Sequence, residues 1–161
     1  MKAYVIVTMV GGAIAASYFT YSSMGDAGKD SVAYGKAAAA FASTASLRLN
    51  GPAEKLHQEI VESCSIARFT VLQKFASDAV IGQALSLVKI NPILTLGDVN
   101  SILGSPIATE TPTSELQCIR SLALFYYAFP DDWNSISSLS GDREALEDIS
   151  SRFESVKDLN S

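Results

Sequence analysis

The feature that most constrains this chain is a long N-terminal stretch without a charged side chain. The 23 residues from Ala3 to Gly25 are all uncharged, and Lys2 and Asp26 bound them. As a helix rising about 1.5 Å per residue, the stretch would extend about 34 Å, enough to cross a hydrocarbon core of about 30 Å. Aromatic residues lie near both of its ends, as expected at two membrane interfaces: Tyr4, Tyr18, Phe19 and Tyr21. The sequence therefore predicts a transmembrane or signal-anchor helix over residues 3–25.

One face of this predicted helix carries small residues. Thr8, Gly12 and Ala16 recur every four residues and therefore share a face. In membranes, small side chains at this spacing let a second helix approach closely. We expect Thr8, Gly12 and Ala16 to form a helix-packing interface with another subunit or with a second copy of the chain.

The charges around the segment predict its orientation. Lys2 precedes the segment, and the next basic residue is Lys29, so the positive-inside rule places the N-terminus in the cytoplasm. The following domain, residues 26–161, would then lie outside the cytoplasm, in a periplasm or extracellular space. A cleaved secretory signal is the alternative, with Ala13-Ile14-Ala15 as its small-x-small cleavage site. Both interpretations export the domain, but only the first keeps it on the membrane.

Residues 26–161 are predicted to form a mainly α-helical domain of about five helices. Apolar residues recur at spacings of three and four, and turn-forming residues separate the runs. The expected helices run from residue 30 or 31 to 50, from 52 to 79, from 95 to 104, from 115 to 129, and onward from 142; a separate helix over 77–91 is an alternative. The aromatic run Phe125-Tyr-Tyr-Ala-Phe129 also favours β-structure, so a minor strand within 116–129 remains open.

The sequence predicts no catalytic, cofactor-binding or metal site. His57 is the only histidine, so the Glu54-x-x-His57 half-motif lacks the second copy that a carboxylate-bridged di-iron bundle requires. We find no nucleophile elbow, phosphate-binding loop or dinucleotide fingerprint. The net charge of −5 arises entirely within residues 131–161, which argues against nucleic acid as a partner.

Two cysteines, Cys64 and Cys118, leave two alternatives open. In an exported domain they could form a disulfide, which would close a loop of more than 50 residues. Alternatively, both lie in apolar helical patterns and would be buried thiols.

These features together predict a non-enzymatic accessory or assembly subunit, anchored in a membrane by residues 3–25 and bound to other protein subunits. A filament or virion protein, whose apolar helix packs in a protein core, is the first alternative. A secreted binding module is the second, with the aromatic residues between Phe125 and Trp133 as its pocket wall.

Overall fold

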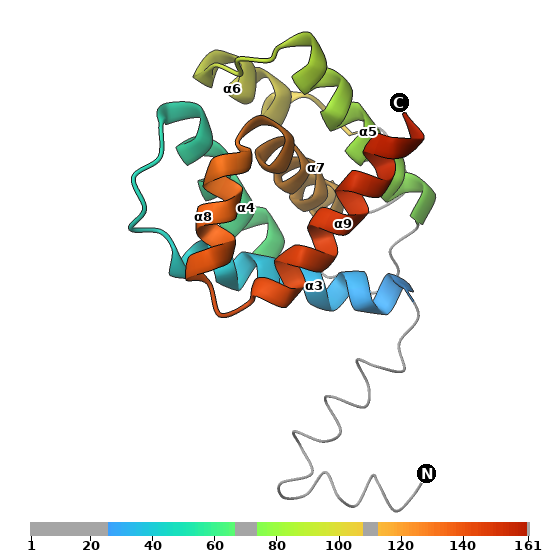
Figure 1. Cartoon of the computed structure of the whole chain (residues 1–161). Coiled ribbons are helices and arrows are strands. Elements are labelled where there is room, and N and C mark those ends of the chain that lie inside the picture. Colours follow the sequence, from blue (N-terminus) through green and yellow to red (C-terminus); the bar gives the residue numbers. More distant parts are fainter. Residues whose placement is uncertain (1–25, 67–73, 108–112, 161) are drawn as a thin grey trace, which may run out of the picture.

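A computed structural model describes residues 26–66, 74–107 and 113–160, and these residues form a bundle of helices without strands (Figure 1). The prediction of a mainly α-helical domain is therefore confirmed for the described residues. The seven helices in these ranges are α3 (Asp26–Ser43), α4 (Gly51–Ile66), α5 (Lys74–Ile90), α6 (Leu96–Gly104), α7 (Thr113–Ala128), α8 (Pro130–Leu139) and α9 (Arg143–Leu159).

The helix count exceeds the predicted five for two reasons. Residues 52–79 do not form one helix. Helix α5 corresponds to the alternative of a separate helix over 77–91, and α4 and α5 both pack against α7. A single helix of that length would extend about 42 Å, whereas two shorter ones can each lay an apolar face on α7. In addition, Pro130 begins a helix of its own, as its fixed φ and missing N–H allow at a first helical position.

Helix α3 ends at Ser43, seven residues before the predicted end at Asn50. Two hydroxyls bond the carbonyl oxygens of its last turn. Ser43 Oγ donates to Ala40 O at 2.9 Å, and Thr44 Oγ1 donates to Ala40 O and Phe41 O at 3.0 and 3.1 Å. These hydroxyls satisfy carbonyls that would otherwise require a further helical turn.

Helix α7 forms the centre of the bundle, and α4, α5, α8 and α9 all contact it (Figure 1). Every residue from Cys118 to Phe125 is buried, so the helix has no solvent-facing stripe within that range. The strand alternative within 116–129 is wrong, because this segment is helical through Ala128. Ser114 lies inside the first turn, and the Gln117 side chain accepts a hydrogen bond from Arg120.

A cluster of aromatic rings joins four helices at the other end of α7. Phe41 of α3 packs edge-on against Phe125 of α7 and Trp133 of α8, with ring centroids 5.2 and 5.9 Å apart. Trp133 also contacts Phe153 of α9 at 6.2 Å. The aromatic run therefore belongs mainly to the core, and the pocket wall proposed for it is not formed by these buried rings.

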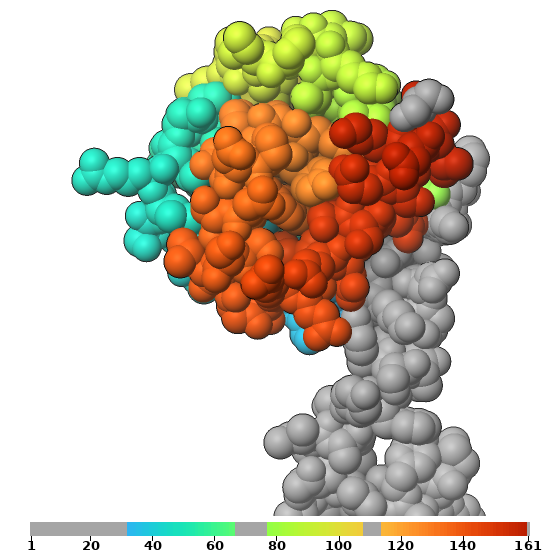
Figure 2. Space-filling view, in the orientation of Figure 1, coloured from blue at the N-terminus to red at the C-terminus, as the bar shows by residue number. Residues whose placement is uncertain are grey.

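Helix α9 closes the bundle through the apolar face that its sequence predicts. Leu146, Ile149, Phe153 and Val156 are all buried, as expected for apolar residues at spacings of three and four. Its Arg152 reaches α5, where Nε lies 3.0 Å from Asp78 Oδ1 and one terminal nitrogen donates to Ser77 Oγ. The space-filling view shows α8 and α9 side by side on one face of the domain (Figure 2).

The corner between α5 and α6 exposes apolar side chains. Ile90 is 75% exposed, Ile93 is 85% exposed, and Leu96 is also exposed. This corner lies at the end of the domain opposite α3, the helix that directly follows residues 3–25 (Figure 1).

No helix within the described ranges is both long and apolar enough to span a membrane. The predicted segment 3–25, its interface residues Thr8, Gly12 and Ala16, and the alternative cleavage site at residues 13–15 all lie outside those ranges.

Candidate functional site

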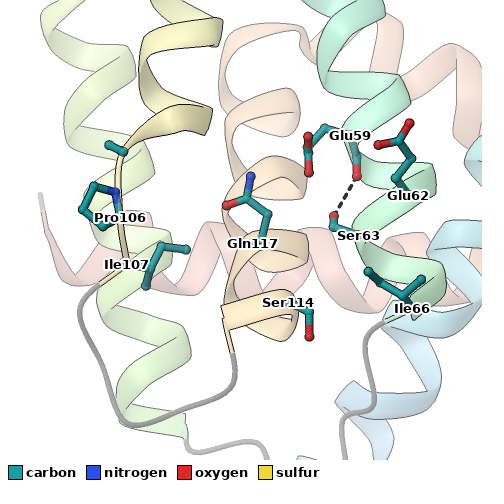
Figure 3. A pocket seen from close by; sticks show the side chains of 9 residues that line it. Glu59, Glu62, Ser63, Ile66, Pro106, Ile107, Ser114 and Gln117 are labelled. Atoms are coloured by element: carbon teal, nitrogen blue, oxygen red, sulfur yellow. Dashed lines mark hydrogen bonds between the residues drawn. The ribbon is translucent and has the colours of Figure 1, made fainter.

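A groove of about 440 Å³ lies between α4 on one side and the end of α6 and the start of α7 on the other (Figure 3). Its volume falls within the range of about 300–1,000 Å³ that is typical of ligand pockets. Its lining combines carboxylates, hydroxyls, one amide and apolar side chains: Glu59, Glu62, Ser63, Ile66, Ser105, Pro106, Ile107, Ser114 and Gln117.

The α4 wall carries both of the charged side chains found among the described residues that line the groove. Four lining residues share one face of this helix, because three of them follow the first at spacings of three, four and seven residues: Glu59, Glu62, Ser63 and Ile66. Ser63 Oγ donates to the Glu59 carbonyl at 2.7 Å, which directs the hydroxyl back along the helix (Figure 3). Neither glutamate forms an ion pair with a cation of the described side chains.

Arg120 of α7 fastens the opposite wall from behind. Its guanidinium, in a residue that is only 4% exposed, donates to Ser105 O and Ser105 Oγ at 3.1 Å and to Leu103 O at 3.3 Å. It also donates to Gln117 Oε1 at 2.5 Å. Burial lowers the pKa of Arg120, and the negative charge of Glu59 partly offsets that fall. The arginine thus caps the end of α6 and orients an amide that faces the groove.

A disulfide joins the two walls beside the groove. Cys64 of α4 and Cys118 of α7 are bonded, with their Cα atoms 4.8 Å apart. Each cysteine directly follows a lining residue, Ser63 in α4 and Gln117 in α7. Of the two alternatives that the sequence leaves open, the structure contains the bond and no thiol among its described residues.

His57 lies away from the groove, in contact with the aromatic core. Its ring is buried, its centroid is 5.2 Å from that of Phe41, and its Nε2 lies 3.4 Å from Thr44 Oγ1. Burial lowers the pKa of the imidazole, while hydrogen bonding with the Phe41 backbone and the charge of Glu54 partly oppose the fall. His57 therefore packs as a neutral core residue. Within the described ranges, no three His, Cys, Asp or Glu residues could together hold a metal ion.

Helix α7 contains a buried carboxyl group. Glu115 is buried, and its Oε2 has no hydrogen-bond partner in the described part of the chain. Desolvation raises the pKa of this carboxyl above its ordinary value. Glu115 does not line the groove.

The structure brings together groove residues from segments that are far apart in the sequence, none of which the sequence singled out as a site. Glu59 and Glu62 come from the predicted helix after Pro52, whereas Ser105 and Gln117 come from later segments. Arg120, which supports one wall, is the residue that the sequence could have revealed. Its signal was present, because a lone basic residue inside the apolar run 116–129 requires buried acceptors.

Comparisons of the chain with protein-family models, with curated proteins and with solved structures found no match.

Proposed function

We propose that this chain is a non-enzymatic accessory or assembly subunit, held on a membrane by residues 3–25, whose helical domain binds other protein subunits outside the cytoplasm. The observation that carries the proposal is the Cys64–Cys118 bond in a domain that follows an uncharged 23-residue segment. Structural disulfides persist in oxidising compartments such as the periplasm and the extracellular space. The bond and the segment therefore indicate the same side of a membrane.

The exposed apolar corner supports a role in protein binding. Ile90, Ile93 and Leu96 lie at the end of the domain opposite α3, where a membrane anchor joined to α3 would leave them accessible. Apolar side chains that gather at an exposed site favour contact with another protein.

Extraction of the full chain from native membranes tests the anchor. We expect the protein to sediment with membranes, to resist washing at high pH, and to enter solution only with detergent. Its intact mass should include residues 1–25. Sedimentation as particles regardless of detergent would favour the filament or virion alternative, and a mass lacking residues 1–15 would favour the secreted one.

Protease added outside intact spheroplasts tests the topology. Because Lys2 precedes the uncharged segment, we expect digestion of residues 53–161 before the cells are lysed. Full protection of the domain until lysis would overturn the proposed export.

Substitution within the segment tests the helix-packing interface. Gly12→Leu places a bulky side chain between Thr8 and Ala16 and should reduce co-purification of partner subunits in detergent. Val10→Leu is the matched control, because residue 10 lies two positions away, on the far side of the same helix. Equal co-purification of both variants with the unaltered chain would refute the interface.

A further inference from the structure

The groove between α4 and α7 has an unbalanced charge. Among the described residues that line it, Glu59 and Glu62 are the only charged ones, and both project from α4. Arg120, whose charge interacts with that of Glu59, is buried and already donates to three oxygens of residues 103–105 and to Gln117. Arg120 offsets one carboxylate at most, so the groove presents a net negative charge to an occupant.

Apolar surface accompanies these carboxylates. Ile66 is exposed near Glu62, and Pro106 and Ile107 lie across the groove, with Gln117 between the two sides (Figure 3). An occupant that satisfies all of these groups needs a cationic head for the carboxylates and an apolar part for the isoleucines. Arginine and lysine next to an apolar residue have this composition, and arginine matches carboxylate geometry especially well.

The walls are fixed before any occupant arrives. The Cys64–Cys118 bond links α4 to α7, and Arg120 links α7 to the end of α6. A preformed site spares an occupant the cost of ordering its walls.

We infer that this groove binds a protein segment in which a basic side chain, arginine or lysine, stands between apolar residues, with the cation between Glu59 and Glu62 and the apolar neighbours on Ile66 and Ile107. Because it names the chemistry of a protein partner, the inference rests on the proposed function.

Methyl resonances of isoleucine provide a direct test on the full chain in uncharged detergent micelles. The chain is labelled with ¹³C at the isoleucine methyl groups and titrated with the peptide acetyl-Leu-Arg-Leu-amide. Two further probes are the same peptide with neutral citrulline in place of arginine, and ethylguanidinium alone. We expect saturable shifts at Ile66 and Ile107 and none at Ile136, which is buried in α8 outside the groove. Binding of the citrulline peptide and of ethylguanidinium should each be at least about fivefold weaker.

Two double variants separate the groove from general electrostatics. Glu59→Gln with Glu62→Gln should weaken arginine-peptide binding about fivefold or more. Glu54→Gln with Glu144→Gln removes the same charge from exposed positions outside the groove and should leave the affinity unchanged. The fluorescence of Trp133, which is buried in the core, verifies that each variant is folded.

Three results would overturn the inference: no shift at Ile66 or Ile107, equal binding of the citrulline peptide, or equal weakening by both double variants. Binding of ethylguanidinium as tight as that of the peptide would overturn the protein occupant in favour of a small cation. Release of the protein from membranes without detergent would refute the proposed function, but it would not change the methyl shifts of Ile66 and Ile107. The two failures are therefore distinguishable.

Discussion

Removing the bond between Cys64 and Cys118 should destabilise the domain by about 4 kcal/mol. The cysteines are 54 residues apart in sequence. Cross-linking residues at that separation restricts the unfolded chain by about this amount in the chain-entropy treatment. With a urea dependence of about 2 kcal/mol per molar, the unfolding midpoint should fall by about 2 M.

Tryptophan fluorescence can follow the unfolding. Trp133 is the only tryptophan and is 3% exposed, so its fluorescence follows unfolding of the aromatic core. Urea titrations would compare the full chain in detergent with and without reductant, together with Cys64→Ala/Cys118→Ala. The comparison of oxidised with reduced wild type isolates the cross-link, because both contain the sulfur atoms. The comparison of reduced wild type with the double variant isolates packing, since both sulfur atoms are buried.

Alkylation in denaturant, where buried thiols become accessible, followed by mass spectrometry without reductant, establishes whether the bond is present in the sample. The bonded peptide pair should be lighter than its two thiol peptides by two hydrogens. A bonded sample whose midpoint changes by less than about 0.5 M on reduction would refute the loop-closure reasoning. Alkylated cysteines in protein purified from outside the cytoplasm would instead refute the bond.

Substitutions at three further positions test the core by the same urea titration. Phe125→Ala should cost about 3–5 kcal/mol, because the ring is fully buried against Phe41 and Trp133; a cost below 1 kcal/mol would contradict that packing. Arg120→Met should cost about 2–3 kcal/mol by leaving the α6 carbonyls without their donor, and Arg120→Lys should not restore it, since lysine lacks the guanidinium fork. Burial lowers the pKa of His57 in the folded protein, so between pH 6.5, the ordinary histidine pKa, and that lowered pKa the unfolded chain binds a proton that the folded protein does not. The free energy of unfolding of the wild type should therefore decrease as the pH falls through this range, and it should level off below the lowered pKa. His57→Gln should reduce this slope between pH 7.5 and 5, and an identical slope would contradict the burial.

Local patterns predicted those helices whose one face is buried. The spacing of the apolar residues was enough to predict α9, because the opposite face of this helix is charged and exposed. The start of α6 after Thr95 was also predictable, because it depends on two local hydrogen bonds. The Thr95 hydroxyl accepts from Asp98 N, and the Asp98 carboxylate accepts from Thr95 N. In both cases the information lies within one turn of the chain or on one helical face.

Helix α7 could not be assigned uniquely because it is buried on all sides. A helix surrounded by neighbours needs no alternation of polar and apolar residues, so Phe125 to Phe129 has the composition of a strand as well. Packing decides between the two states, because α4, α5, α8 and α9 each supply a surface for part of the helix. The end of α3 was missed for a different reason. The Thr44 hydroxyl donates to backbone carbonyls of the last turn, a contact that helix propensity does not include.

The groove depends on contacts between segments that are far apart in sequence. Glu59 lies 58 residues before Gln117, and the disulfide and Arg120 are what bring their helices and the end of α6 together. The charge of Arg120 is costly in a core, and the backbone oxygens of residues 103 and 105 are the acceptors that make its burial tolerable. The polar groups that sustain this arginine are also those that shape one wall of the groove. A substitution at Arg120 would therefore change stability and groove shape together. Substitutions at Glu59 and Glu62, whose carboxylates form no hydrogen bond or ion pair with a described side chain, leave the hydrogen bonds of Arg120 in place.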